Sequence, residues 1–260
     1  MMQKKGFVVR DLTVRYADGH AHMAAIDHVS VDLPVGGVTA IIGESGSGKS
    51  TLGQALFGAL PPDAAVEGQV LFDGADVTVL GRKELCSQYW GKRWGIVPQL
   101  PRAALSPVHR IARQIADVRR GAGRSAWPAA QYEALLARFG FDDPARVLAS
   151  YPHELSGGML QRVLCAMGDA GEPQWILADE PTKGLDPAVW QMVADNLKCL
   201  AARADASLLL ITHDIPLAQQ LAEYVVVMQA GRIVEEGTDV WAHPAHPYTK
   251  AYFRAQPQFL

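Results

Sequence analysis

Four short segments carry residues that could act on phosphate groups. In chain order they are Gly43-Glu44-Ser45-Gly46-Ser47-Gly48-Lys49-Ser50, Leu155-Ser156-Gly157-Gly158-Met159-Leu160-Gln161, Ile176-Leu177-Ala178-Asp179-Glu180 and Thr212-His213-Asp214. The first offers glycines, an ammonium group and a hydroxyl, and the second offers exposed backbone N–H groups. The third ends in two carboxylates, and the fourth carries an imidazole. Such groups can bind a polyphosphate, hold a divalent cation and activate water.

The first segment has the arrangement that a nucleoside triphosphate requires. A strand-like apolar run, residues 38–42, leads into it, and helical spacing of apolar residues follows. Gly46 and Gly48 let the backbone N–H groups converge on phosphates, and the helix adds its positive end. We predict that Lys49 neutralises the β- and γ-phosphates, Ser50 binds Mg²⁺ and Thr51 bonds the α-phosphate. The predicted nucleotide-binding residues here are Gly43, Ser45, Gly46, Gly48, Lys49, Ser50 and Thr51.

Asp179 and Glu180 follow a strand-like apolar run at residues 175–178. In a parallel sheet the carboxyl ends of the strands face the ligand crevice. We therefore predict that Asp179 holds Mg²⁺ through water and that Glu180 polarises the attacking water as general base. Two acids after a strand are also common in solvated turns, so the interpretation depends on the phosphate-binding segment upstream.

Ser156 is a good helix N-cap, and Gly157 and Gly158 expose backbone donors at the helix start, so the segment forms a second anion site. An ordinary N-cap would account for Ser156 alone, but not for the Gln161 and Arg162 that follow. The four segments together resemble the ATPase subunit of an ATP-binding cassette (ABC) transporter. The resemblance implies that residues 156–158 reach the γ-phosphate held by an opposing subunit, so that two subunits enclose two ATP molecules.

Four single residues gain a role from this resemblance. Tyr16 matches the aromatic residue that stacks on adenine, and Gln99 matches the glutamine that senses Mg²⁺ and couples the core to a helical insertion. His213 matches the histidine that contacts the γ-phosphate and orients the water, although a lone histidine after a strand is usually structural. Asp186 matches the aspartate of a dimer-contact loop. The implied ligands are ATP and Mg²⁺.

The elements that must position these residues alternate between strand and helix. The predicted fold class is α/β: a P-loop NTPase core with a mostly parallel sheet, an N-terminal antiparallel β subdomain and an inserted α-helical subdomain. Residues 1–240 are the predicted ATPase domain, with the insertion at about 100–170, and residues 241–260 are a C-terminal tail. We expect the helix after Lys49 to end at Pro61-Pro62, and Pro107, Pro128 and Pro144 to mark helix starts.

Composition excludes several other classes. The 260 residues are 49% hydrophobic and 20% charged, and the net charge of −3 argues against a nucleic-acid partner. No apolar run approaches the roughly 18 residues of a membrane span, and the N-terminus lacks the apolar core of a signal peptide. The three cysteines indicate neither a disulfide framework nor a metal cluster, and we expect them in or near a core. A reduced, cytoplasmic location follows.

The segment from Arg102 to Arg124 holds six arginines against one acid, Asp117. A solvated helix face is the favoured interpretation. The alternative is a surface that faces a permease and anionic lipid headgroups.

The segment His243-Pro244-Ala245-His246-Pro247-Tyr248-Thr249 resembles the tail of oligopeptide, dipeptide and nickel importer ATPases. The resemblance implies a subunit bound peripherally to the cytoplasmic face of the inner membrane. Its implied partners are a second ATPase subunit, related or identical, two permease subunits and an extracytoplasmic substrate-binding protein. The implied cargo is a peptide, nickel or a metal–chelator complex. Two histidines between prolines make a poor metal-ligand set.

Two features depart from the family pattern. Leu100 stands where the family usually carries an acid, and the chain stops at Leu260 where longer relatives continue into a cysteine-containing extension. The alternative function is a soluble ABC ATPase subunit of a non-transport complex, such as a phosphonate-degrading assembly. A regulatory module that binds ATP without hydrolysing it is disfavoured because Glu180 and His213 are both present.

Overall fold

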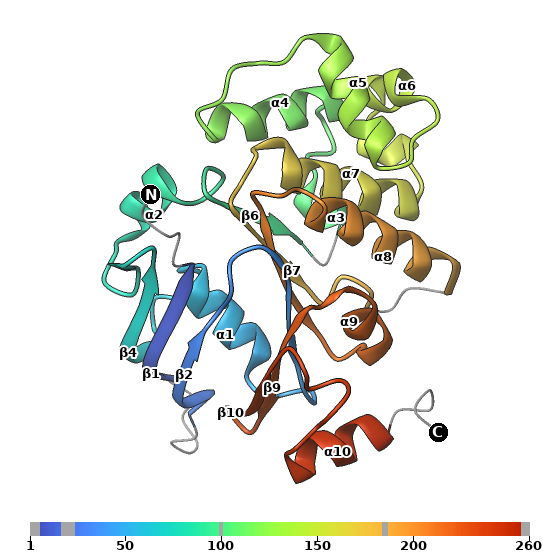
Figure 1. Cartoon of the computed structure of the whole chain (residues 1–260). Helices are drawn as coiled ribbons and strands as arrows, with labels where there is room; N and C mark the ends of the chain where they lie inside the picture. Colours follow the sequence, from blue (N-terminus) through green and yellow to red (C-terminus); the bar gives the residue numbers. More distant parts are fainter. Residues whose placement is uncertain (1–5, 17–23, 99–100, 184–186, 256–260) are drawn as a thin grey trace. The chain divides into compact units, whose positions relative to one another are not determined.

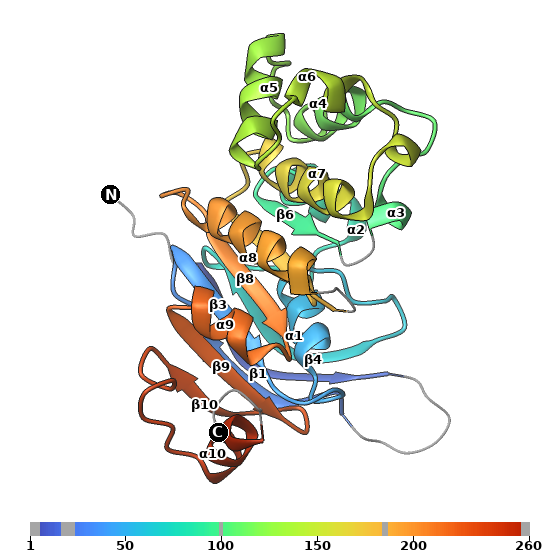
Figure 2. The same ribbon diagram turned by 90° about the vertical axis from the view of Figure 1, so that its right-hand side faces the viewer.

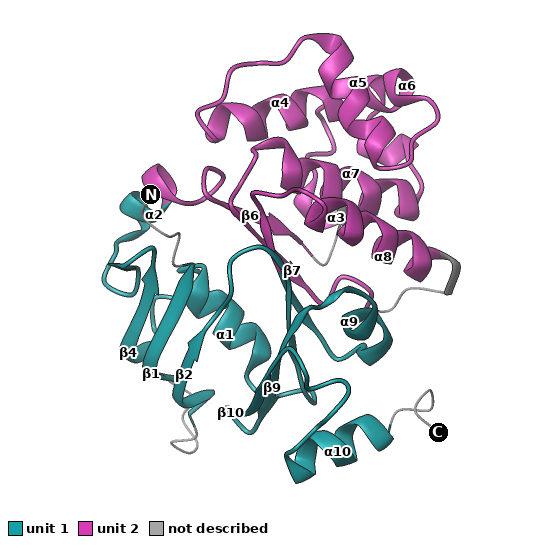
Figure 3. Ribbon diagram, viewed as in Figure 1, with its two compact units in different colours: residues 1–85, 209–260 teal, residues 86–208 magenta. Residues whose placement is uncertain are grey.

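The computed structural model describes residues 6–16, 24–98, 101–183 and 187–255 (Figure 1). The chain divides into two compact units (Figure 3). Unit 1 comprises residues 1–85 and 209–260, and unit 2 comprises residues 86–208.

Unit 1 contains an antiparallel sheet with the strand order β2-β1-β4-β5. Apolar and polar residues alternate along β2, and its apolar side chains are buried while its polar ones face outward, as a half-buried strand requires. The strands are β1 (Phe7–Arg15), β2 (Ile26–Asp32), β4 (Ala65–Phe72) and β5 (Ala75–Asp76).

A second set of strands in unit 1 is centred on β3, in the order β10-β9-β3-β8, of which β8 belongs to unit 1 from Leu209 onward. β3 pairs in parallel with β9, and β9 forms an antiparallel hairpin with β10. Residues 229–231 form the turn of this hairpin, with positive φ at Ala230 and Gly231. The strands are β3 (Gly37–Ile42), β8 (Ser207–Thr212), β9 (Tyr224–Gln229) and β10 (Arg232–Gly237).

Unit 1 also contains helices α1 (Lys49–Leu56), α9 (Ile215–Leu221) and α10 (Pro247–Arg254) (Figure 2). The prediction that the first helix ends at Pro61-Pro62 is wrong. Helix α1 ends at Leu56 because Gly58 takes a left-handed conformation, with φ of 60°, which terminates a helix without steric cost. Phe57 then turns into the core against Phe7, with ring centroids 5.4 Å apart.

Unit 2 combines two parallel strands with most of the helices. β6 (Trp94–Val97) pairs with β7 (Trp175–Asp179), and Trp94 lies opposite Trp175 in the register. Helix α7 (Gly157–Ala170) contacts α3, α4, α5, α8 and β6, so it is central to the unit. The helices are α2 (Arg82–Gln88, where the chain enters the unit), α3 (Pro101–Ala104), α4 (Ile111–Gly121), α5 (Ala129–Arg138), α6 (Pro144–Ala149), the 3₁₀ turn η1 (Pro152–Glu154), α7 and α8 (Pro187–Ala201).

Two of the three predicted proline helix starts are confirmed. Pro128 precedes α5 as its N-cap residue, and Pro144 is the first residue of α6. The prediction for Pro107 is wrong, because α4 begins at Ile111. The side chain of Gln114 accepts a hydrogen bond from the N–H of Ser106 (2.8 Å) and donates to two carbonyls of the same turn, which holds residues 106–109 outside the helix.

The cysteines are not all in the core as expected. Cys165 is buried and Cys199 half-buried, but Cys86 is exposed because α2 buries only Leu85. None of the helices in the described ranges is long and apolar enough to span a bilayer.

Candidate functional site

The glycine-rich loop between β3 and α1 is held by close backbone contacts. A Cβ atom on Gly43 would lie 2.2 Å from the carbonyl oxygen of Met228, and one on Gly48 would lie 2.4 Å from that of Ala25. Both residues also have positive φ, at 148° and 100°. Only glycine fits these two positions, so the loop is clamped at both ends while Glu44, Ser45 and Gly46 remain exposed.

Lys49 is buried beneath this loop, with 5% of its surface exposed. Its Nζ donates to the carbonyl oxygens of Gly43 (2.9 Å) and Glu44 (2.7 Å). A buried ammonium group is stable only when such acceptors compensate the loss of water. The lysine therefore places a positive charge directly under the exposed part of the loop.

Three observations show that the loop suits a phosphate group. Gly48 is the N-cap residue of α1, and it has no side chain that could compete with an anion for the N–H groups of the first turn. The hydroxyl of Ser47 is buried and lacks a hydrogen-bond partner among the described residues. The charge of Lys49 completes the set. These are the donors that a polyphosphate requires.

Unit 1 also brings Tyr16 to this loop. The hydroxyls of Tyr16 and Thr51 lie 3.3 Å apart, so the predicted adenine-stacking residue contacts the predicted α-phosphate ligand. His213 follows the end of β8 and is exposed. Asp214 caps α9 by accepting a hydrogen bond from the N–H of Leu217 (3.1 Å), which fixes the backbone on the far side of His213.

In unit 2, Asp179 is the last residue of β7 and Glu180 follows it. Both side chains are half-buried. Glu180 has φ of 48°, a left-handed conformation that costs a non-glycine residue roughly 1–2 kcal/mol. Backbone strain of this kind is concentrated at functional sites, where the surrounding structure maintains it. The geometry is consistent with the predicted roles of the two acids and adds a feature that sequence patterns do not reveal.

The glycine pair of the second segment begins α7. The predicted N-cap is confirmed, because the Ser156 hydroxyl accepts a hydrogen bond from the N–H of Met159 (3.3 Å). Ser156 and Gly157 are exposed, and a Cβ on Gly157 would meet no atom within 4 Å. The start of α7 is therefore open to a ligand or to another chain.

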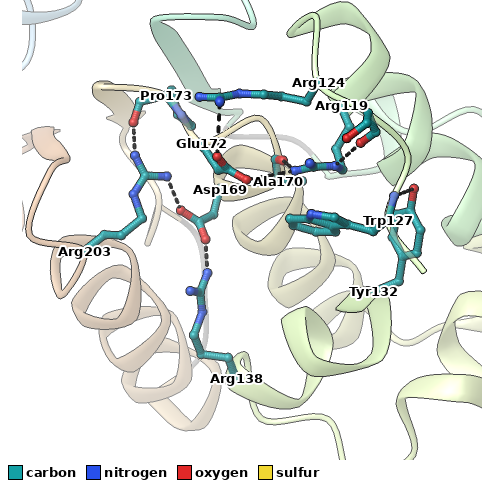
Figure 4. Close-up of polar contacts among 11 residues, drawn as sticks. Arg119, Arg124, Trp127, Tyr132, Arg138, Asp169, Ala170, Glu172, Pro173 and Arg203 are labelled. Atoms are coloured by element: carbon teal, nitrogen blue, oxygen red, sulfur yellow. Dashed lines mark hydrogen bonds and ion pairs between the residues drawn. The ribbon is translucent and has the colours of Figure 1, made fainter. Parts of the chain in front are cut away.

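The opposite end of α7 is held by charged side chains that sequence analysis did not find (Figure 4). Asp169, which is 5% exposed, pairs with Arg203 at 2.8 Å and also with Arg138. Arg119 is buried over the Trp127 ring, 3.6 Å from its centroid, so the expectation of a solvated or membrane-facing arginine is wrong for this residue. Its guanidinium donates to the carbonyl oxygen of Ala170 at 2.7 Å.

The predicted site residues are divided between the units. Unit 1 holds Tyr16, the glycine-rich loop and His213, whereas unit 2 holds the Ser156 segment, Asp179 and Glu180. Gln99 and Asp186 lie outside the described residues. One sequence feature could have indicated that Asp169 forms buried ion pairs. Asp169 lies three residues after Ala166 and four after Cys165, which places its carboxylate on the apolar face of α7.

Known proteins resemble this chain in both sequence and fold. The sequence profile of the ABC transporter family matches residues 26–183. The chain is 40% identical, over 96% of its length, to the peptidoglycan transport ATP-binding protein YejF of Agrobacterium fabrum, and it spans 47% of that protein. It is 36% identical to the oligopeptide transport ATP-binding protein OppD of Bacillus subtilis, covering 96% of this chain and 71% of that one.

The dimeric ATP-binding cassette MJ0796, solved with ADP and Pi in a post-hydrolysis state, superposes with a TM-score of 0.75 and 27% identity. That match covers 89% of this chain and 98% of MJ0796. The chain belongs to the ABC transporter family and contains its ATPase domain. The predicted fold class, a P-loop NTPase core with an antiparallel β subdomain and a helical insertion, is confirmed.

Proposed function

We propose that this chain is the ATP-hydrolysing subunit of an importer that takes up peptides or peptide-like compounds. The observation that carries the proposal is the buried Lys49 at the start of α1, together with the buried Ser47 hydroxyl, which has no hydrogen-bond partner among the described residues. This arrangement supplies several donors and a fixed positive charge to one phosphate chain.

Each predicted residue has a chemical task in this proposal. Lys49 exchanges the two loop carbonyls for the oxygens of the β- and γ-phosphates, and Thr51 bonds the α-phosphate. Tyr16 stacks on the adenine. Ser50 and Asp179 offer the oxygen ligands that Mg²⁺ prefers, as does Gln99. When bound, Mg²⁺ neutralises the charge that develops on the phosphates.

Hydrolysis needs a base and an orienting group for water. In this proposal Glu180 accepts the proton of the attacking water, and His213 orients that water and contacts the γ-phosphate. The strained backbone at Glu180 supports this role, because strain is retained where a side chain must point in one direction.

The exposed start of α7 supports completion of the site by a second subunit. Ser156, Gly157 and Gly158 would provide donors to the nucleotide of an opposing ATPase subunit, related or identical. The superposed cassette MJ0796 is dimeric, which supports this arrangement. Two permease subunits and an extracytoplasmic binding protein complete the proposed importer, with this chain peripheral on the cytoplasmic face of the membrane.

The cargo is proposed from two relatives, YejF and OppD, which are peptidoglycan and oligopeptide transport proteins. Nickel and metal–chelator complexes remain part of the prediction made from the tail sequence. Among the described residues no group of three or more histidines, cysteines or acids could hold a metal ion.

Replacing Glu180 by Gln tests the proposal. We expect kcat for ATP hydrolysis to fall by about 100- to 10,000-fold, because the amide cannot accept the proton, while ATP binding persists and stabilises a dimer. The matched control is Glu133→Gln on the exposed face of α5, which should keep wild-type turnover. Turnover of the Glu180→Gln variant within tenfold of the wild type would refute the assignment. Co-purification with integral membrane proteins supports transport, and its absence supports the soluble non-transport assembly.

A further inference from the structure

The tail that follows the ATPase core reaches the glycine-rich loop. Tyr248, the second residue of α10, accepts a hydrogen bond from the backbone N–H of Glu44 at 3.3 Å. The two residues are 204 positions apart in the sequence, and both belong to unit 1. The contact therefore joins the C-terminal tail to the segment that the proposed function assigns to phosphate binding.

The hydrogen bond falls on the same peptide group that holds the lysine. A trans peptide is planar, and its carbonyl and N–H point in opposite directions. The carbonyl oxygen of Gly43 accepts from Lys49 Nζ at 2.9 Å, and the N–H of Glu44 at the other end of that peptide donates to Tyr248. The Tyr248 hydroxyl thus restrains the rotation of the peptide to which Lys49 is bonded.

The tail is anchored firmly enough to aim this hydroxyl. The Glu235 carboxylate on β10 accepts hydrogen bonds from the N–H groups of Ala245 (2.6 Å) and His246 (3.1 Å). Figures 1 and 2 both show α10 beside β10. The rings of Tyr248 and Tyr252 stack with centroids 5.7 Å apart and an interplanar angle of 6°, and Tyr252 is buried.

The chemistry of the phenol suits a fixed acceptor. Burial is the largest influence on the pKa of Tyr248; it and the charge of Glu44 raise this pKa above its ordinary value of 10.0, against the opposing effect of the Glu44 N–H. The hydroxyl therefore stays neutral at physiological pH and accepts the N–H through a lone pair.

We propose that Tyr248 is a positioning residue of the nucleotide site, through which the C-terminal tail sets the affinity of the glycine-rich loop for nucleotide. The inference rests on the proposed function of that loop. Without the hydroxyl, the peptide between Gly43 and Glu44 gains rotational freedom. Nucleotide binding must then order this peptide, and the cost of ordering lowers affinity.

The test compares two substitutions that remove the same kind of hydrogen bond. Tyr248→Phe keeps the ring that stacks on Tyr252 and removes only the hydroxyl. Tyr132→Phe removes an acceptor of a backbone N–H, that of Trp127, at the same distance of 3.3 Å in unit 2. The full chain is titrated with a fluorescent ADP analogue in the presence of Mg²⁺. We expect Kd to rise about 3- to 10-fold for Tyr248→Phe and to stay at the wild-type value for Tyr132→Phe.

A second readout separates positioning from general loss of structure. In steady-state hydrolysis, Tyr248→Phe should raise KM for ATP by the same factor and leave kcat within about twofold, because no reacting group has changed. Glu235→Ala should also raise the Kd, by releasing the tail, but should add nothing further in the Tyr248→Phe background. This non-additivity is expected only when the tail acts through the hydroxyl.

Several results would overturn the inference: an unchanged Kd for Tyr248→Phe, an equal rise for Tyr132→Phe, or additive effects in the double variant. A wild-type chain that binds no nucleotide would instead refute the proposed function itself. The two failures are distinguishable, because one appears in the variants and the other in the unmodified protein.

Discussion

The glycine-rich loop and helix α7, which both carry proposed nucleotide-binding residues, are held in place by different kinds of interaction. The two ends of the glycine-rich loop of unit 1 are fixed by backbone: Gly43 packs on the Met228 carbonyl, Gly48 on that of Ala25, and β3 is paired with β9. Helix α7 of unit 2 is fixed at its C-terminal end by side chains, in which Asp169 joins Arg138 and Arg203.

The difference has a physical consequence for each region. A loop clamped by carbonyl contacts has few conformations, so its donors are ordered before a ligand arrives and little affinity is lost to ordering. A helix end held by ion pairs depends on solvent access and on the length of flexible arginine side chains. The fixed loop is suited to binding. The attachment of α7, in contrast, can be weakened by changing a single charged residue.

Asp169→Ala should produce the largest effect and would break the side-chain attachment. Removal of a carboxylate that is 5% exposed leaves two guanidinium groups without their common acceptor. We expect the free energy of unfolding to fall by about 3 kcal/mol, at the low end for buried pairs because the side chain of Arg138 is 43% exposed. Urea denaturation followed by tryptophan fluorescence measures this, since five of the six tryptophans lie in unit 2.

Asp205→Ala is the matched control for that variant. Asp205 also pairs with Arg203, at 3.0 Å, but its side chain is 70% exposed. Its removal should change the free energy of unfolding by less than about 0.5 kcal/mol. Equal effects of the two substitutions would show that the buried pair does not hold α7.

Two glycine substitutions test whether close backbone contacts fix the glycine-rich loop. Gly43→Ala would place a methyl group 2.2 Å from the Met228 carbonyl, so the loop or β9 must move. At Gly46, which has φ of 80°, a methyl group would meet nothing within 4 Å. We expect Gly43→Ala to lower the free energy of unfolding by about 2 kcal/mol, and Gly46→Ala by about 1 kcal/mol from backbone strain alone.

Urea denaturation followed by circular dichroism measures both variants. If Gly46→Ala proves at least as destabilising as Gly43→Ala, then the positive φ angles, rather than the close contact with the Met228 carbonyl, are the reason that the loop requires glycine.

The sequence allowed the fold and the binding loop to be predicted because those features depend on local patterns. Alternating apolar residues mark β2, and the glycine spacing marks the loop before α1. The early end of α1 depended instead on which of several turn residues, Gly58 or the two prolines, would stop the helix first. Asp169 could not be paired with Arg203 from the sequence, because 34 residues separate them and many arginines were available.

The Tyr248 contact was beyond prediction for the same reason. The tail sequence indicated a family, but the target of the tyrosine depends on how β10 and α10 pack together. Long-range side-chain contacts follow from tertiary structure, whereas strands, turns and glycine loops follow from neighbours in the chain.

Glu235 resembles the α7 attachment, since it anchors the tail of unit 1 by an acidic side chain, and its removal gives the smallest predicted effect. Burial raises the pKa of its carboxyl. Hydrogen bonds, including those from the N–H groups of Ala245 and His246, together lower the pKa by a larger amount, so it lies below the ordinary value of 4.5. The ionised form is therefore favoured in the folded protein. The stabilisation is complete above pH 4.5, the value for the unfolded chain, and is lost as the pH falls through the lower pKa of the folded state.

Hydrogen exchange of the peptide that covers α10, with rates corrected for intrinsic exchange at each pH, measures this effect. Protection should stay constant from pH 7 to about 4.5 and decrease below it, by less than about 1 kcal/mol because the carboxylate is partly exposed. The Glu235→Gln variant should show weaker protection with no such pH dependence, because its amide does not titrate. A wild-type tail whose protection does not change on acidification would mean that apolar contacts such as the Trp241–Phe253 stack, with centroids 5.2 Å apart, hold it instead.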